Sequence, residues 1–366
     1  MVTVFALLLA LHGLIHLIGA AKAFGADFPQ IAQPISPIVG GLWLLAAGLF
    51  LATALLVFLW PRGWWAIGAA AVAISMSAIV ASWADAKVGA LANAIVLVGV
   101  VFGFLAQGPF SLRARYDRDV RSRVSTAASP LPVTERDLAH LPAPVQRYLR
   151  TAGVVGQPRV RTFRVRLHGR IRGGRTARWM PLRAEQYNVV EPAARLFYLN
   201  ASMFGIPVQG YHRYLETSAS MEVRAAALVP VARAAGPEMT RSETVTLFND
   251  MCLMAPATLI GSSIEWETVD ARTARARFTN AGHTIRAELF FNEAGELTNF
   301  VSDDRSAVSA GGTMRPLRWS TPVAAYRRYG SIRLFSRGEG RWQEPDGEYV
   351  YIELIIDDVR YNVPPH

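Results

Sequence analysis

Residues 88–123, VGALANAIVLVGVVFGFLAQGPFSLRARYDRDVRSR, contain the point at which the sequence changes from apolar to charged. The part over 88–106 approaches the ~20 residues that a helix needs to cross the ~30 Å hydrocarbon core of a bilayer. The chain up to residue 108 is almost free of charge, whereas the chain after it carries nearly all of the charged residues. The sequence therefore predicts one part adapted to lipid and one part adapted to water.

Three further apolar stretches precede this one, so the predicted fold begins with a four-helix transmembrane bundle. The first stretch could be a cleaved signal peptide, but no basic residue precedes it and it is longer than the apolar region of such a peptide. We therefore expect it to be retained. Residues 1–108 are assigned to the transmembrane region and 109–133 to a basic juxtamembrane segment and linker. The four expected spans are about 4–21, 38–60, 64–83 and 88–106.

The basic residues near the ends of these spans predict the orientation, because cytoplasmic loops carry an excess of Lys and Arg. With the N-terminus inside, the outer loops carry only Lys22 and Lys87. We expect a multi-pass protein of the bacterial inner membrane with its soluble domain in the cytoplasm. The arginines after the last span either contact anionic lipid, at about 1 kcal/mol each, or serve only to set the topology. They are Arg113, Arg115, Arg118, Arg121 and Arg123.

Three polar side chains, His12, His16 and Asn93, fall inside the predicted membrane region. The histidines are spaced i, i+4 and so share one helix face. Polar side chains at this depth are rare and often functional. Hydrogen bonding between helices is the interpretation we favour, and contact with a metal, a quinone or a haem is the alternative. A haem would need a histidine from a second helix, which this region lacks. A metal would need further ligands, but the candidate Asp85 lies at an interface, so we expect no metal and no cofactor.

The composition argues against several classes of function. The formal net charge is +10, but the arginines scatter singly through strand-like segments and do not alternate with stacking aromatics, so nucleic-acid binding is not expected. Cys252 is the only cysteine, which excludes an intrachain disulfide. The sequence contains no P-loop, GxGxxG or HExxH motif. The sequence therefore favours a function other than catalysis.

From Thr134 onward, alternating apolar and polar residues separated by turns predict a soluble, β-rich domain over 134–366. About nine to eleven strands, mostly joined as hairpins, form an antiparallel sheet too large to stay flat, so we expect it to curl into a half-barrel-like shape. The domain is therefore of the α+β class, with the sheet wrapping one or two helices. The expected strands are 160–171, 185–190, 196–202, 208–216, 264–269, 274–279, 285–292, 297–302, 332–342 and 349–359.

One clear helix interrupts the strands. Thr240-Arg241-Ser242-Glu243 has the pattern of a capping box, and the helix that follows stops at Pro256. Because apolar residues cover more than half of its circumference, we expect it to lie in the concavity of the sheet, where it can leave an apolar chamber. The candidate ligand contacts, each of which could instead be core, are Trp179, Tyr198, Phe204, Phe248, Met251, Trp266, Trp319 and Trp342.

Several motifs of the soluble half resemble an uncharacterised bacterial family of membrane-anchored proteins, over about residues 135–363. They include Trp319-Ser320-Thr321-Pro322, Gly338-Glu339-Gly340 and the segment 237–243, PEMTRSE. More loosely, hairpins such as FFNEAGELTNF, 290–300, around a buried helix resemble the lipoprotein-carrier fold, a half-barrel that holds acyl chains. That second resemblance implies a site outside the cytoplasmic membrane, which conflicts with the predicted topology.

Three functions stay open from the sequence alone. The favoured one is a membrane protein whose β domain binds a lipid or another hydrophobic small molecule near the bilayer, with membrane lipids as its partners. The second is a scaffolding or regulatory domain that binds a protein partner of unknown identity. The third is a membrane redox or metal protein that uses His12 and His16.

Overall fold

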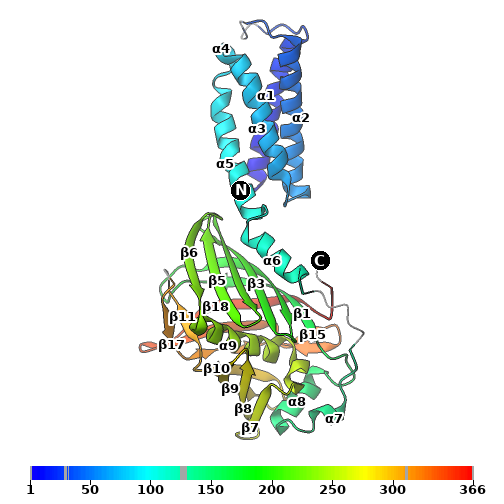
Figure 1. Cartoon of the computed structure of the whole chain (residues 1–366), viewed down its shortest axis with the longest axis vertical. Coiled ribbons are helices and arrows are strands. Elements are labelled where there is room, and N and C mark those ends of the chain that lie inside the picture. Colours follow the sequence, from blue (N-terminus) through cyan, green and yellow to red (C-terminus); the bar gives the residue numbers. More distant parts are fainter. Residues whose placement is uncertain (1, 29–30, 32, 124–129, 310–311, 365–366) are drawn as a thin grey trace. The chain divides into compact units, whose positions relative to one another are not determined.

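The computed structural model describes residues 2–28, 31, 33–123, 130–309 and 312–364. The chain forms two compact units, Met1–Arg115 and Tyr116–His366, which differ sharply in secondary structure (Figure 1). Residues 124–129 of the predicted linker lie outside the described part.

The first unit contains the helices of the predicted four-helix bundle, each long and apolar enough to cross a membrane. Small residues let these helices approach closely. At Gly103, for example, a Cβ atom would lie only 2.4 Å from the side chain of Trp64. The four long helices are α1 (Val2–Ala23), α2 (Pro37–Leu59), α3 (Trp64–Ala81) and α5 (Gly89–Gln107). The short helix α4 (Trp83–Ala86) lies between α3 and α5 in the sequence, and α6 (Leu112–Arg121) follows α5.

The second unit is built on a fourteen-strand sheet whose described pairings are all antiparallel. Thirteen strands follow one another in the order β6-β5-β4-β3-β2-β1-β18-β17-β13-β10-β9-β8-β7, and β14 pairs with β17. Their bounds are β1 (Thr162–Ile171), β2 (Met180–Val189), β3 (Ala194–Met203), β4 (Ile206–Leu215), β5 (Ser218–Ala225), β6 (Val229–Ala235), β7 (Ile264–Thr268), β8 (Thr273–Asn280), β9 (His283–Phe291), β10 (Leu297–Ser302), β13 (Trp319–Ser320), β14 (Val323–Ala324), β17 (Arg337–Glu344) and β18 (Gly347–Tyr361).

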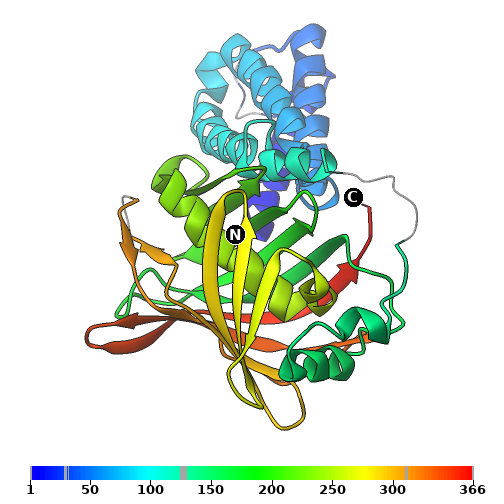
Figure 2. The same ribbon diagram turned by 60° about the horizontal axis from the view of Figure 1, so that its bottom comes forward.

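The sheet consists of two meanders joined side by side where the first strand, β1, pairs with the last, β18. The chain leaves the first meander at its edge strand β6, crosses the concave face as the helix α9 (Pro237–Met254), and enters the second meander at the opposite edge strand, β7. Figures 1 and 2 show α9 enclosed by the curl of the sheet. The predicted half-barrel around a helix is confirmed.

Smaller elements complete the second unit. Two short hairpins accompany the large sheet, β11 (Ser306–Val308) with β12 (Met314–Pro316) and β15 (Arg327–Tyr329) with β16 (Ile332–Leu334). Three short helices precede or follow the strands, α7 (Glu135–Leu138), α8 (Ala143–Ala152) and the 3-10 helix η1 (Pro256–Ile260).

Side chains alternate in direction along β1, so this one strand contributes residues to both faces of the sheet. Phe163, Val165 and Leu167 are buried in the core on the concave side. On the other face, Arg164 forms an ion pair with Glu185 at 2.9 Å. The apolar residues therefore fix which face curls inward.

The sheet differs from the sequence prediction in several places, and its fourteen strands exceed the nine to eleven expected. The hairpin β5–β6 was not expected, because the segment 218–235 is rich in alanine and lacks a regular alternation. Pro230 is tolerated in β6 because that strand is an edge of the sheet. The single strand expected over 332–342 is divided between β16 and β17.

The start of α9 also differs from the predicted capping box. The helix begins at Pro237, and Gly236 before it has a φ of 96°, which favours glycine. Thr240 therefore lies within the first turn, where its hydroxyl donates to the carbonyl of Gly236 at 2.9 Å and accepts the N–H of Ala219 at 3.1 Å. Glu243 therefore lies inside the helix and does not cap its N-terminus.

The second half of α6 belongs to the β-rich unit. The ring of Tyr116 packs between Tyr198 and Tyr211, with both centroid distances 5.9 Å. One turn later, the carboxylate of Asp119 accepts hydrogen bonds from the Tyr211 hydroxyl at 2.7 Å and from Arg213 at 2.9 Å. These contacts lie on the convex side of β3 and β4, so a fragment starting at residue 134 would lose them.

Phe248 on α9 lies at the centre of the packed core and stacks on Phe278 at 5.0 Å. We predict that Phe248→Ala lowers the free energy of unfolding by about 3–5 kcal/mol, because it creates a cavity in this core. The single thiol, Cys252, is buried, and burial raises its pKa. Its labelling by a fluorogenic maleimide during heating of the full chain in detergent therefore reports unfolding.

The matched control for this experiment is Phe204→Ala, since the Phe204 side chain is exposed. We expect the midpoint temperature of Cys252 labelling in this variant to stay within about a degree or two of that of the unchanged chain, because most surface substitutions have small effects on stability. Equal midpoints for the two variants would contradict the placement of Phe248 in the core.

Candidate ligand-binding site

A cavity of about 700 Å³ lies inside the half-barrel, between α9 and the concave side of the strands. Its wall includes residues of β1 to β6 on one side and of β13, β17 and β18 on the other. The β11 segment also contributes to the wall. Most lining side chains from the strands are apolar, including Leu167, Phe197, Val223 and Leu354.

The helix α9 presents its polar side to this cavity. Its lining residues recur every three or four positions, the spacing of one helix face. The opposite side of the helix carries Val245, Phe248 and Cys252, which are fully buried in the core. The face toward the cavity consists of Met239, Ser242, Glu243, Thr246, Asn249, Asp250, Leu253 and Met254.

Arg195 of β3 neutralises the acidic residues of this polar face. Its Nη1 donates to Glu243 at 2.9 Å and its Nε donates to Asp250 at 2.5 Å. Gln186 also donates to Asp250, at 2.7 Å, and His212 lies 2.9 Å from the second Glu243 oxygen. The side chains of Arg195, Glu243 and Asp250 are each at most 8% exposed. Strands and helix are thus joined by a buried ion cluster.

Burial and charge act in opposite directions on the two carboxyl groups. Burial acts to raise the pKa of Glu243, but Arg195 and His212 outweigh it and lower the pKa to about 2. Burial raises the pKa of Asp250, because it outweighs the attraction of Arg195 and the hydrogen bond from Gln186. Glu243 is therefore the firmly ionised partner of Arg195.

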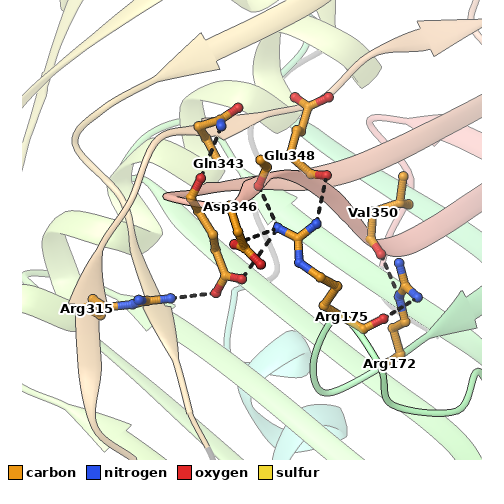
Figure 3. Close-up of polar contacts among 9 residues, drawn as sticks. Arg172, Arg175, Arg315, Gln343, Asp346, Glu348 and Val350 are labelled. Carbon is orange, nitrogen blue, oxygen red and sulfur yellow. Dashed lines mark hydrogen bonds and ion pairs between the residues drawn. The ribbon is translucent and has the colours of Figure 1, made fainter.

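Arginines connect the segment between β1 and β2 to the hairpin of β17 and β18, as Figure 3 shows. Arg175, in the connection between β1 and β2, donates to the Gly347 carbonyl at 2.6 Å and to Asp346 at 3.1 Å. Arg172, which lines the cavity, donates to the Val350 carbonyl at 2.7 Å. The loop after β1 is thus tied to the hairpin of β17 and β18.

Three of the eight candidate ligand contacts line the cavity, namely Phe204, Trp319 and Trp342. Five lie elsewhere. Phe248, Met251 and Trp266 belong to the packed core or its edge. Tyr198 faces α6 on the convex side, and Trp179 is stacked by Arg170 and Arg172 at 4.5 Å each.

The three polar residues predicted inside the membrane, His12, His16 and Asn93, form one hydrogen-bonded group with Ser75. His12 donates to the Asn93 carbonyl oxygen at 3.0 Å, and Ser75 donates to the same oxygen at 3.0 Å. His16 hydrogen-bonds to Ser75 at 2.7 Å. The group links α1, α3 and α5. Within the described residues, no three His, Cys, Asp or Glu side chains lie close enough to hold a metal ion.

The arginines after the last apolar helix have different surroundings. Arg118 and Arg121 are exposed, and Arg113 and Arg115 are partly buried. Arg123 forms an ion pair with Glu216 at 3.2 Å. Contact with anionic lipid therefore stays a prediction, which the exposure of Arg118 and Arg121 allows.

Sequence reasoning did not identify the ion cluster. The sequence pattern predicts Glu243 as a capping residue and gives Arg195 no distinction from the other scattered arginines. One signal was present in the sequence: Glu243, Thr246 and Asp250 recur at the spacing of one face of the helix. Nothing in the sequence placed Arg195 opposite that face, because the two are distant along the chain.

The cluster has limited means for covalent chemistry. His212 is oriented by Glu243, as a general base would be. Among the described residues, however, no serine, threonine or cysteine is hydrogen-bonded to His212. The geometry supports binding of a polar group more directly than it supports nucleophilic catalysis.

The profile of a family of unknown function, DUF6544, matches residues 132–354. The chain belongs to this family. The match covers the β-rich unit from the segment before α7 into β18, so DUF6544 describes the half-barrel and its cavity. No curated protein matches the chain.

Solved structures with a similar fold include a DUF1329 family protein from Desulfovibrio piger and a LolA superfamily protein from Nitrosomonas europaea. The first is 12% identical with a TM-score of 0.35, and the match covers 60% of this chain and 92% of the other. The second is also 12% identical, with a TM-score of 0.28 and coverage of 60% and 94%. Both resemblances expected from the sequence are thus confirmed, but likenesses at this level carry no argument about function.

We predict that Arg195→Met lowers the free energy of unfolding by about 3–5 kcal/mol at pH 7, because two buried carboxyl groups lose their counter-ion. The matched control is Arg272→Met, which removes an exposed ion pair with Glu293 and should cost less than about 1 kcal/mol. Unfolding of the full chain in detergent, followed by tryptophan fluorescence, measures both.

The cost of Arg195→Met should depend on pH. The folded-state pKa of Glu243 is about 2, below the ordinary 4.5, so its ionised form stabilises the fold above about pH 4.5. That contribution is lost as the pH falls from about 4.5 through about 2. The difference in the free energy of unfolding between the unchanged chain and Arg195→Met should therefore shrink over the same pH interval. A difference that stays constant from pH 7 to pH 3 would contradict the Arg195–Glu243 pairing.

Proposed function

We propose that this DUF6544 protein is an integral membrane protein whose half-barrel binds a lipid or another hydrophobic ligand close to the bilayer. The observation that carries the proposal is the cavity inside the half-barrel. Its volume of about 700 Å³ lies within the range of about 300–1,000 Å³ typical of small-molecule sites. Apolar strands and a polar helix face suit a molecule with an apolar chain and a polar group.

An exposed apolar rim supports access from a lipid surface. Phe204 and Ile206 are exposed at the turn between β3 and β4, and Leu228 and Val229 are exposed at the turn between β5 and β6. The two turns are neighbours because β4 pairs with β5. Phe204 also lines the cavity. Contiguous exposed apolar residues mark interaction sites, and we propose that this rim meets the bilayer and admits the ligand.

The same rim supports the alternative, a scaffold that binds a protein partner. The two functions differ in their use of the cavity. A carrier or sensor of lipid needs the interior empty of side chains, whereas a scaffold that binds through the rim does not. Filling the cavity therefore separates the two.

We predict that Val223→Trp, which places an indole in the cavity, lowers the fraction of chain carrying a bound lipid by about tenfold. Native mass spectrometry of the full chain, released from detergent after purification from its membrane, measures that fraction. Val269→Trp is the control, because Val269 is exposed outside the cavity. Lipid-free spectra for the unchanged chain would contradict the proposal and favour the scaffold.

The orientation proposed for the chain places the half-barrel in the cytoplasm of a bacterial cell, with α1, α2, α3 and α5 crossing the inner membrane. The basic residues that flank the last helix motivate this orientation. We predict that a green fluorescent protein fused to the C-terminus fluoresces in cells, and that an alkaline phosphatase fused at the same place is inactive. The reverse pattern would place the domain on the side where lipoprotein carriers work.

A further inference from the structure

Arg305, between β10 and β11, holds its guanidinium in a fixed position on the cavity wall. The Cζ atom lies 4.2 Å from the ring centroid of Trp319 and 4.9 Å from that of Trp342. Stacking of this kind orients a guanidinium without using its hydrogen-bond donors. The Nε atom donates to the Thr246 hydroxyl of α9 at 3.0 Å. The strands and the helix therefore fix the group together.

The other N–H donors of this group have no acceptor among the described residues. A guanidinium has five N–H donors, and the bond to Thr246 is the one side-chain hydrogen bond that Arg305 makes to a described residue. Its Nη1 is buried without an acceptor among the described residues, and so is the indole Nε1 of the adjacent Trp319. Leaving buried donors without acceptors is costly. Two such donors on the same wall of one cavity point to an acceptor supplied by a ligand.

The carboxylates on the cavity wall are committed to other partners. Glu243 is bonded to Arg195 and His212, and Asp250 to Arg195. Glu339 accepts from Arg341 at 2.8 Å. Arg305 therefore lies within ion-pair distance of no carboxylate among the described residues, although its charge, after those of Arg195 and His212, contributes to the lowered pKa of Glu243.

We infer that Arg305 and Trp319 recognise the oxyanion of an amphiphile, a carboxylate or a phosphate, whose apolar chain occupies the rest of the cavity. The inference rests on the proposed function and deepens it by naming the class of ligand. A guanidinium edge matches the two oxygens of a carboxylate or phosphate. Apolar residues of β14, β17 and β18, such as Val323 and Leu354, line the same cavity and receive the chain.

The test compares probes that share a ten-carbon chain and differ in the head group. Decanoate and decyl phosphate carry an oxyanion, decanol does not, and inorganic phosphate lacks the chain. Binding to the full chain in nanodiscs of a zwitterionic lipid is measured by equilibrium dialysis, with empty nanodiscs subtracted. We expect the anionic amphiphiles to bind about tenfold or more tightly than decanol. Inorganic phosphate alone should bind weakly, since it leaves the apolar wall uncovered.

Substitutions identify the residues responsible. Arg305→Gln should lower the affinities for the anionic probes to about that of decanol, whereas Trp319→Phe, which keeps the ring and removes the N–H, should reduce the preference by a few-fold. Arg277→Gln is the control, because Arg277 is an exposed residue of β8 outside the cavity. Thermal unfolding of each variant shows that it is folded.

The outcomes separate this inference from the proposed function. Equal binding of decanoate and decanol to the unchanged chain would overturn the inference and leave hydrophobic binding intact. Binding of none of the chain-bearing probes would overturn both. Tight binding of inorganic phosphate alone would show an anion site without a lipid ligand. That result would overturn the inference that the ligand is an amphiphile. A decanoate preference that survives Arg305→Gln would overturn the assignment to Arg305.

Discussion

The interior of the half-barrel depends on the pairing of Arg195 with Glu243 and Asp250. A helix that turns acidic residues inward would normally be unfavourable, since isolated charges are costly to bury. Here one guanidinium from β3 serves both carboxylates, and Gln186 and His212 use further oxygens. The pairing therefore allows α9 to present a polar face to the inside of the protein.

The orientation of α9 divides the interior into a packed side and an open side. On one side Phe248 and its neighbours fill the space against β8 and β10. On the other side, polar groups of the helix face apolar strands across the cavity, and the two surfaces do not pack against each other. Rotating the helix to close the cavity would separate Glu243 and Asp250 from Arg195. A buried ion cluster adds little net stability, but it can select one arrangement, and here that arrangement keeps a cavity open.

The sequence predicts features that depend on local periodicity and fails where distant residues meet. The four apolar helices and most of the strands follow from patterns of about ten to twenty residues. The hairpin β5–β6 was missed because alanines and Pro230 give no alternation, and its position at the sheet edge tolerates them. Glu243 was given a local role as a cap, but the helix starts earlier and the residue acts across the domain. Arg305 carries no local signal in the sequence, because its stacking partners are brought to it by the sheet order.

The polar groups of the interior differ in how completely they are satisfied, and this difference argues for two separate roles. Arg195 is paired on both sides with carboxylates, as expected of a group that holds the helix in place. Arg305 is held as firmly, by two tryptophans and Thr246, yet its charge has no ion-pair partner among the described residues. A group that served only to hold the structure together would be expected to use more of its donors within the protein. The contrast between two arginines in one cavity, one paired with two carboxylates and the other with none among the described residues, supports assigning the first to the fold and the second to a ligand.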